Sequence, residues 1–432
     1  MKLKKYKLGD IAKIEISGVD KKTIEGETPV RLCNFVDVYY NWAITKEKAK
    51  SFMVASAKQT EIDKCSIGKG MVAITKDSET RDDIGVATYI ADDFEDVLLG
   101  YHCALITPNP AVVDGKYLNA FMHTRYIQKY FENNASGSGQ RYTLSNDTIS
   151  NIPVLLPSIE EQHTIGKVLA DIDRKIELNK QINDNLEEMA KQLYDYWFVQ
   201  FDFPNEEGKP YKSSGGAMVW NDKLKREIPN GWTVKTVGTY ANCKSGYAIN
   251  SSDFKAKGIP VIKIGNIQED YTLNMNGCQY IDNNANKQFY AYQNDVVIAM
   301  TGATIGKFAI VPYSEKGYFV NQRVGKFELG NNPIEKMPYL INSLKIDYFR
   351  NQIFQLASGC AQPNISAEQI NNISLLYPLT KYLSEYNMKC KWMYEQMVNC
   401  RYQIDMLTKL RDELLPLLMN GQATVNYHLS DD

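Results

Sequence analysis

The chain repeats parts of itself about 221 positions apart, and this internal duplication most limits how it can fold. ASGSGQ at 135–140 returns as ASGCAQ at 357–362, and ISNIPVLLP at 149–157 returns as INNISLLYP at 370–378. Each copy continues into a long stretch with helical periodicity. A chain of two similar units, each followed by a helix, has a pseudo-twofold repeat. Duplex DNA is one partner that suits such symmetry.

Shorter matches extend the repeat through most of each copy. PVRLCN at 29–34 matches PVIKIGN at 260–266, GMVAI at 70–74 matches DVVIA at 295–299, and IG at 84–85 matches IG at 305–306. Short β-rich runs at 71–75, 296–300 and 308–311 alternate with turn residues, and the amphipathic stretches 116–132 and 338–356 are typical of one or two helices. The sequence therefore predicts duplicated α/β domains of mixed α+β type, each of roughly 150 residues.

A capping signal and a heptad seam mark the first long helix. Ser158 and Glu161 fit the S-x-x-E capping box, in which the two side chains satisfy free backbone N–H groups at a helix start. A 3-4 spacing of apolar residues and two asparagines follows and includes Ile172, Ile176, Asn179, Asn183, Leu186 and Leu193. Sustained spacing of this kind predicts a coiled-coil partner helix, whose register the asparagines would fix.

A second long helix carries its own seam, which includes Met397, Ile404 and Leu407. Pro416 should disturb its last turns, and Gly421 should end it. The two seams most simply pair with each other, because strict 3-4 spacing is narrower than a helix packed on a globular domain needs. The alternative is that each helix packs separately on its neighbouring domain. We expect a pseudo-twofold monomer joined by two long antiparallel coiled-coil helices.

The segment between the first helix and the second copy has the Pro, Gly, Asn and Ser content of a linker. The expected boundaries are 1–157 for the first globular domain, 158–200 for the first spacer helix, 201–227 for the linker, 228–379 for the second globular domain, 380–422 for the second spacer helix and 423–432 for a tail.

Composition excludes several classes of protein. A hydrophobic content of 44% and a charged content of 23% are ordinary for soluble globular domains. No apolar run is long enough to span a membrane, and the basic N-terminus lacks the apolar region of a signal peptide. The eight Cys are scattered without a C-x-x-C pair, and only four His are present. We therefore expect reduced thiols, a cytoplasmic location and no zinc site.

The charge balance permits a nucleic-acid partner without requiring one. The whole chain has a net charge of −2, but residues 221–378 carry 16 basic and 12 acidic side chains, a net charge of +4. The second globular copy is therefore mildly basic, and its surface is compatible with DNA.

The motifs of common enzymes are absent from the sequence or incomplete. GATIGKF at 302–308 is one residue shorter than a phosphate-binding loop, and Phe308 stands where a Ser or Thr would hold magnesium. No G-x-G-x-x-G motif follows a strand, and no Asn/Asp-Pro-Pro-aromatic tetrapeptide of the kind that methylates an amino base occurs. We expect a chain without catalytic residues, metal or cofactor of its own.

Four segments, in their order and spacing, resemble the specificity subunit of type I restriction-modification systems. They are LLPSIEEQHTIG at 155–166, YWFVQF at 196–201, IPNGW at 228–232 and LLPLLMNG at 414–421. The resemblance covers essentially the whole chain, although the second helix opens PLTKYLS and lacks the expected Glu-Gln pair.

This resemblance implies two target-recognition domains, each reading one half of a split sequence in double-stranded DNA, with the helices as spacers. It also implies partners: methyltransferase subunits, expected to number two, that dock on the helices and bind S-adenosylmethionine. Restriction-translocase subunits that use ATP and magnesium would join the full complex. The chain itself would then be a non-catalytic subunit.

Candidate DNA-binding residues lie in the duplicated loops and after the matched strands. Arg, Lys, Asn and Gln side chains read base edges, and basic residues with loop N–H groups hold phosphates. The candidates are Arg31, Asn34, Gln140, Arg141 and Tyr142 in the first copy, and Lys263, Asn266, Thr304, Lys307, Gln322, Arg323, Gln362 and Asn364 in the second. Any one of them could instead be a solvated loop residue that bonds its own backbone.

Two other interpretations compete with DNA recognition. A coiled-coil scaffold that assembles other proteins would bind no duplex even at low salt, and a stand-alone methyltransferase would bind S-adenosylmethionine by itself. The first is the main alternative, because the missing motifs disfavour the second.

Overall fold

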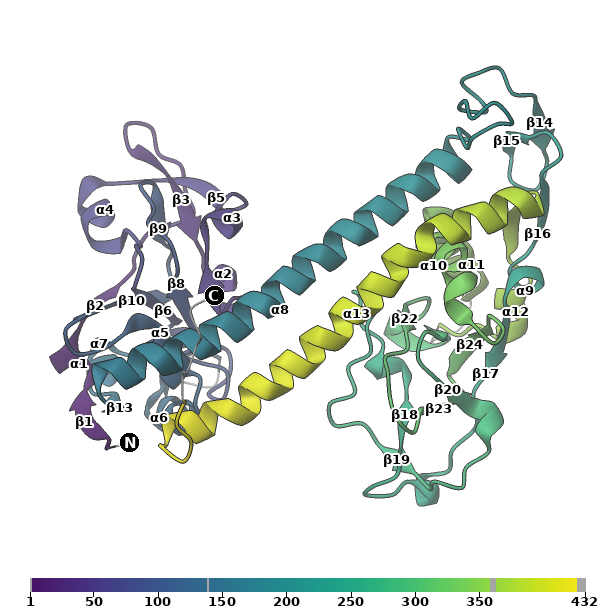
Figure 1. The fold of residues 1–432 in the computed structure, drawn as a ribbon. Helices are drawn as coiled ribbons and strands as arrows, with labels where there is room; N and C mark the ends of the chain where they lie inside the picture. Colours follow the sequence, from purple (N-terminus) through teal and green to yellow (C-terminus); the bar gives the residue numbers. More distant parts are fainter. Residues whose placement is uncertain (1, 138–139, 358–362, 426–432) are drawn as a thin grey trace, which may run out of the picture. The chain divides into compact units, whose positions relative to one another are not determined.

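The computed structural model describes residues 2–137, 140–357 and 363–425. The chain divides into two compact units (Figure 1). Unit 1 is formed by Met1–Glu177 with Met406–Asp432, and unit 2 by Leu178–Asp405. These divisions fall inside the two long helices. Each unit thus contains a stretch of both helices, because the helices supply part of each core.

Unit 1 is built on two mixed sheets. The five-stranded sheet has the order β2 (Ala12–Ile16), β10 (Cys103–Pro108), β6 (Val72–Thr75), β8 (Ala87–Ile90) and β4 (Ala43–Ile44). The three-stranded sheet has the order β5 (Met53–Ala57), β3 (Thr28–Cys33) and β9 (Val97–Leu99). Smaller pairings join β1 (Lys4–Lys7) to β13 (Pro153–Leu156), and β12 (Tyr142–Thr143) to β11 (Ser136–Gly137) and β7 (Asp77–Ser78).

The helices of unit 1 cover these sheets and surround one main core. They are α1 (Leu8–Ile11), α2 (Phe35–Tyr40), α3 (Lys46–Ala49), α4 (Gln59–Cys65), α5 (Gly115–Met122), α6 (Arg125–Asn134) and α7 (Asn146–Ser150). Tyr117 and Phe121 on α5 are almost completely buried and share a core with Leu415 and Leu418 of the second long helix. Two helices thus form where the amphipathic stretch 116–132 predicted one or two.

Unit 2 repeats this plan with four-stranded sheets. One sheet has the order β17 (Asn242–Ser245), β24 (Val324–Glu328), β21 (Val296–Ala299) and β22 (Phe308–Ile310). The other has the order β19 (Tyr280–Ile281), β18 (Ile259–Ile262), β23 (Tyr318–Val320) and β20 (Tyr290–Ala291). The α-helices within the domain are α9 (Val237–Tyr240), α10 (Met337–Lys345), α11 (Asp347–Ala357) and α12 (Ala367–Asn371). Short 3-10 turns occupy Ser251–Asp253, Ile264–Asn266, Lys287–Phe289, Gly302–Thr304 and Pro333–Glu335.

Most strand pairings of unit 1 have a counterpart in unit 2, which confirms the internal duplication. β1 pairs with β13 antiparallel in unit 1, as β16 (Thr233–Thr236) pairs with β25 (Ser374–Tyr377) in unit 2. The parallel pair β3–β9 has its counterpart in β18–β23. Gly85 and Gly306 occupy equivalent turns with φ angles of +80° and +79°, a conformation that glycine adopts without strain.

The two long helices, α8 (Ile159–Tyr194) and α13 (Thr380–Met419), run antiparallel within each unit, which confirms the predicted pairing. In unit 2 the Asn179 amide donates to Gln403 Oε1 at 3.1 Å, and the Tyr386 hydroxyl donates to the Ala190 carbonyl at 3.4 Å. Residues further along α8 therefore contact residues earlier in α13, as antiparallel helices require. In unit 1, Arg411 lies 3.7 Å from Asp173 and continues the same order.

The nine seam residues are all buried or partly buried. Ile172, Ile176, Leu186 and Met397 are at most 9% exposed. The remaining seam residues, Asn179, Asn183, Leu193, Ile404 and Leu407, are partly buried. The helix α13 continues through Pro416 to Met419, and Gly421 follows it with a φ of +76°.

Residues 201–227, which the composition marks as a linker, contribute to the core of unit 2. A π-helical turn at Asp195–Val199 ends α8, and β14 (Met218–Asn221) then pairs with β15 (Arg226–Pro229). Phe203 is 1% exposed and stacks on Trp232 with 4.7 Å between ring centroids. The aromatic residues of this segment therefore outweigh its Gly and Ser content, because they bury apolar area.

Gln162, from the EEQ run at the start of α8, has an internal role in unit 1. It is 1% exposed, accepts a hydrogen bond from the Asp114 N–H at 3.0 Å and donates to two backbone carbonyls at 3.1 Å each. In unit 2, Asn387 accepts from the Tyr339 N–H at 3.0 Å. A buried amide thus ties helix to domain in both units, although the second helix lacks the Glu-Gln pair.

His123 is an ionisable group enclosed in unit 1. Its ring stacks on Trp42 with centroids 4.2 Å apart, and its Nε2 bonds the Ala87 carbonyl at 3.0 Å. The Arg411 guanidinium lies over the same Trp42 ring, 4.9 Å from its centroid. Burial, followed by repulsion from Arg411, lowers the pKa of His123 to about 4.

We expect unit 1 to lose stability through His123 as the pH falls from about 6.5 to about 4. Unfolded histidine takes up a proton near pH 6.5 but the folded residue does so only near its pKa of about 4, so protons favour the unfolded state in this window. The difference corresponds to at most about 3 kcal/mol of free energy of unfolding. Urea unfolding at several pH values should show a flatter pH profile in His123→Gln than in the wild type. Replacement of the exposed His163 by Gln is the control, and equal profiles for wild type and His123→Gln would contradict the prediction.

Candidate nucleic-acid interface

Three segments of unit 1 meet where β6 ends and β10 begins, at one end of the central strands of its five-stranded sheet. The Lys76 N–H, just after β6, donates to the His102 carbonyl at 2.9 Å. The Leu144 N–H donates to the Lys76 carbonyl at 2.8 Å, and β12 pairs with β7. The end of β6, the turn before β10 and the duplicated loop after α6 are therefore held together by backbone hydrogen bonds.

A buried carboxylate gathers basic side chains at this edge. Asp77 lies 2.9 Å from the Lys76 ammonium, 2.5 Å from His102 Nδ1 and 3.8 Å from the Arg141 guanidinium. Burial favours the neutral acid, but hydrogen bonds from Thr143, Lys76 and His102 outweigh it and lower the pKa of Asp77. Asp77 is therefore charged at neutral pH and orients the basic groups around it.

The outer layer of this cluster is available to a ligand. The Arg141 side chain is 58% exposed and Tyr101 is 46% exposed. The Arg81 guanidinium lies over the Tyr142 ring, 4.9 Å from its centroid. Exposed arginine, lysine and tyrosine side chains on loops are the groups that bind phosphates and base edges in DNA.

Unit 2 builds the same backbone frame. The Met300 N–H donates to the Arg323 carbonyl at 3.0 Å, and the Ile365 N–H donates to the Met300 carbonyl at 2.9 Å. Thr301 forms an isolated bridge with Asn364, in the place of the β7–β12 pairing. Arg323 thus occupies the position of His102, and Thr301 that of Asp77.

The side chains on the two frames differ. Unit 2 presents Gln322, Arg323 and Asn364, which are all exposed, and has no carboxylate at the Thr301 position. The Thr301 hydroxyl donates to the Pro363 carbonyl at 3.1 Å, which fixes the loop without attracting cations. One scaffold therefore carries two different sets of hydrogen-bonding groups.

Two candidates of the first copy, Arg31 and Asn34, have internal partners or are buried. The Arg31 guanidinium forms two hydrogen bonds to the Asp96 carboxylate, at 2.6 and 2.8 Å, and a third to the Ala49 carbonyl at 2.8 Å. Asn34 is 6% exposed and precedes α2 as its N-cap residue. Arg31 therefore serves the fold of unit 1, and Asn34 lies next to the turn at Gly100.

The corresponding residues of unit 2 also bond within the domain. The Lys263 ammonium donates a hydrogen bond to Gln279 Oε1. It also lies over the Phe254 ring, 4.2 Å from the ring centroid. Asn266 donates to the Asn274 carbonyl at 2.8 Å. The Lys263 N–H bonds Asn266 as the Asn34 N–H bonds Asp37, so Lys263 is the structural counterpart of Asn34. The sequence alignment paired Asn34 with Asn266 instead.

The remaining candidates lie in or beside the duplicated loops. Gln140 is exposed and Tyr142 is partly buried. Thr304 and Lys307 follow the Thr301 turn, and the Lys307 ammonium pairs with Glu269 at 3.0 Å. Gln362 lies outside the described residues.

Several residues of the interface were missed by sequence reasoning. Lys76, Asp77, Tyr101 and His102 were not among the candidates, although Gln322 and Arg323 were. GYHC at 100–103 and NQRV at 321–324 share no identical residue, so the repeat is invisible there. The two segments can be aligned only by their position directly before the equivalent strands β10 and β24.

Within 2–137, 140–357 and 363–425, no group of three or more His, Cys, Asp or Glu side chains is arranged to hold a metal ion. In the same residues, no helix is both long and apolar enough to cross a membrane.

Comparison with known proteins gives consistent matches. The family model described as the type I restriction modification DNA specificity domain matches residues 2–188 and 229–382. The MjaIX specificity subunit of Methanocaldococcus jannaschii is 26% identical over 328 residues, 74% of this chain and 71% of that protein. The HindI specificity subunit of Haemophilus influenzae is 22% identical over 397 residues, 80% of this chain and 85% of that protein.

A solved structure shares the fold over almost the whole length. The crystal structure of the type I restriction-modification S subunit from M. genitalium superposes with a TM-score of 0.60 at 15% identity. The superposition covers 99% of this chain and 97% of that one.

Proposed function

Because the chain belongs to the type I restriction-modification DNA specificity family, we propose that each unit reads one half of a bipartite target in double-stranded DNA. The interface of unit 1 contains Lys76, Tyr101, His102 and Arg141, and that of unit 2 contains Gln322, Arg323 and Asn364. One observation carries the proposal: the same backbone frame occurs in both units and carries different polar side chains. Different donors and acceptors select different bases, so the half-sites should differ in sequence.

The helices α8 and α13 supply the spacing in this proposal. With 36 and 40 residues they extend for about 54 and 60 Å, more than one turn of the DNA duplex. A paired, continuous helix is stiff on this scale, so the distance between half-sites is expected to be fixed.

The outward faces of the same helices suit a protein partner. On α8, Leu178, Ile182 and Met189 are 38–54% exposed at helical spacing. On α13, Met388 is 69% and Trp392 is 48% exposed, one turn apart. Exposed apolar residues grouped on one face mark interaction sites, and we assign this face to a methyltransferase subunit, with two such subunits in the complex.

The other components follow from this assignment. S-adenosylmethionine would bind the methyltransferase subunits, and ATP and magnesium would bind restriction-translocase subunits in the full complex. The chain itself would contribute recognition and no catalysis, in the cytoplasm where the host DNA lies.

The test of the proposal is a spacing series. The chain, co-purified with its methyltransferase subunits, is titrated against duplexes whose half-sites are separated by the native spacer or by one or two base pairs more or fewer. The target is first identified by mapping methylated positions in the source genome with and without this gene. A change of one or two base pairs should weaken binding about 100-fold or more, because only one unit can then contact its bases. Equal binding to all spacer lengths would contradict the proposal that the helices fix the distance between half-sites. Absence of binding to any duplex would favour a coiled-coil scaffold.

A further inference from the structure

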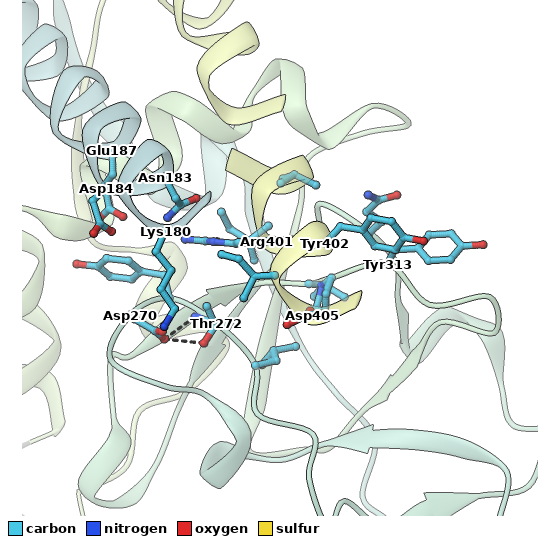
Figure 2. A pocket seen from close by; sticks show the side chains of 18 of the residues that line it. Lys180, Asn183, Asp184, Glu187, Asp270, Thr272, Tyr313, Arg401, Tyr402 and Asp405 are labelled. Atoms are coloured by element: carbon cyan, nitrogen blue, oxygen red, sulfur yellow. Dashed lines mark hydrogen bonds between the residues drawn. The ribbon is translucent and has the colours of Figure 1, made fainter. Parts of the chain in front are cut away.

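Unit 2 contains a cavity of about 800 Å³ that the recognition surface does not use. Its walls come from α8, α13, the end of α10 and the loops between strands of the domain (Figure 2). The residues that matter here are Asn183, Tyr271, Tyr313, Lys345, Arg401 and Asp405. Gln322, Arg323 and Asn364 are not among the described lining residues, so this is a separate site.

Arg401 on α13 has an unsatisfied donor in this cavity. Its Nη1 is buried and has no hydrogen-bond partner. Burial lowers the pKa of Arg401, although Glu187 and Asp270 favour the charged form. A buried N–H group without an acceptor is costly even where carboxylates lie nearby, so this donor points to a ligand that accepts hydrogen bonds.

An unsatisfied acceptor lies near this donor. Asn183 Oδ1 on α8 is buried without a partner, and the two atoms do not bond each other. Figure 2 shows the Arg401 guanidinium on the Asn183 side of the cavity, with Tyr313 and Tyr402 at the other side. The cavity therefore offers one donor and one acceptor from facing helices, and these do not satisfy each other.

The neighbouring lysine, in contrast, is satisfied. The Lys345 ammonium forms an ion pair with Glu187 and lies over the Tyr271 ring, 4.2 Å from its centroid. Lys345 therefore needs no further partner, and Arg401 is the buried cation with a donor to offer a ligand.

The charge of the lining limits the class of ligand. The cations are Lys180, Lys191, Lys345 and Arg401, and the carboxylates are Asp184, Glu187, Glu188, Asp270 and Asp405, for a net formal charge of −1. A polyphosphate would meet excess negative charge here, so a ligand without phosphates is favoured. The volume suits a molecule of nucleoside size, and the tyrosine rings suit a planar one.

We propose that this cavity binds a guanine nucleoside. Guanine O6 is an acceptor to which Arg401 Nη1 can donate, and arginine with guanine is the commonest specific contact between a side chain and a base. The neighbouring N1–H and N2–H groups are donors, and Asn183 Oδ1 accepts one of them. Asp405, which also lines the cavity, is a further acceptor. Burial raises the pKa of Asp405, and the nearby Arg401 lowers it. Adenine places an amino donor where Arg401 requires an acceptor, and is therefore disfavoured.

The experiment uses the full chain, without DNA, and guanosine, inosine, adenosine and GTP as probes. Calorimetry should show guanosine binding, with inosine weaker and adenosine and GTP at least about 10-fold weaker. Guanosine at ten times its Kd should raise Tm by about 3–6 °C. Absence of guanosine binding, or equal binding of guanosine and adenosine, would overturn the assignment.

Variants separate binding from folding. Arg401→Met should abolish the guanosine response because it removes the unsatisfied donor, and the Tm of the free variant shows whether it still folds. Asn183→Ala should weaken guanosine at least about 10-fold and keeps the test valid if Arg401→Met unfolds. Lys389→Met, which removes a cation of α13 outside the cavity, is the matched control and should bind guanosine normally. An unchanged guanosine response in both cavity variants would refute the site.

Discussion

Replacing Trp392 by serine should weaken assembly with the methyltransferase subunit about 30-fold or more. Trp392 is 48% exposed on α13, and Met388 one turn earlier is 69% exposed. Tryptophan is the residue type most often found to dominate an interface, because it buries a large rigid area at low entropic cost. Loss of at least about 2 kcal/mol corresponds to the stated change in affinity.

Trp220 offers a matched control for this variant. It is 61% exposed on β14 of the same unit and belongs to neither long helix. Trp220→Ser should leave assembly unchanged when the variants are compared by analytical ultracentrifugation or calorimetry with the purified methyltransferase. If Trp392→Ser assembles as tightly as the wild type, the outward face of α13 is not the docking surface.

Arg141→Ala should lower the affinity of the assembled complex for its target about 10- to 100-fold. The Arg141 guanidinium is exposed beside the Asp77–His102 pair, which restricts its position. Removal of a base-reading side chain from unit 1 should relax sequence preference at one position of one half-site and leave the other half-site unaffected. Binding to a panel of duplexes with single base-pair changes measures this directly.

The comparison with Arg125→Ala controls for loss of positive charge. The Arg125 side chain is 71% exposed on α6 of the same unit. Its removal should change affinity little and preference not at all, since long-range attraction alone is screened by salt. A uniform loss over all duplexes with Arg141→Ala, together with a smaller salt dependence, would identify Arg141 as a phosphate-binding residue instead.

The repeat and the long helices were predictable because identical residues and regular spacing are properties of the sequence itself. The division into units was not, since it depends on how Leu415 and Leu418 share a core with Tyr117. The sequence also did not reveal that residues 201–227 fold as part of unit 2. Its Gly and Ser content suggested a linker, and the burial of Phe203 against Trp232 is a tertiary effect.

The candidate site shows the same limit. Sequence reasoning selected Arg323 but not His102, because their equivalence exists only in backbone hydrogen bonds. It also selected Arg31, whose guanidinium is held by Asp96, 65 residues away. The sequence shows which loop residues are polar, but it does not show which distant residue forms hydrogen bonds or ion pairs with them.

The composition of unit 1 has a consequence for synthesis on the ribosome. Its core joins residues near the N-terminus, such as Leu8, to Leu415, Leu418 and Met419 of α13. Residues 2–157 therefore cannot complete the core of unit 1 until residues 415–419 have emerged from the ribosome. A nascent chain should hold this core open throughout the synthesis of unit 2 and close it once the end of α13 is available.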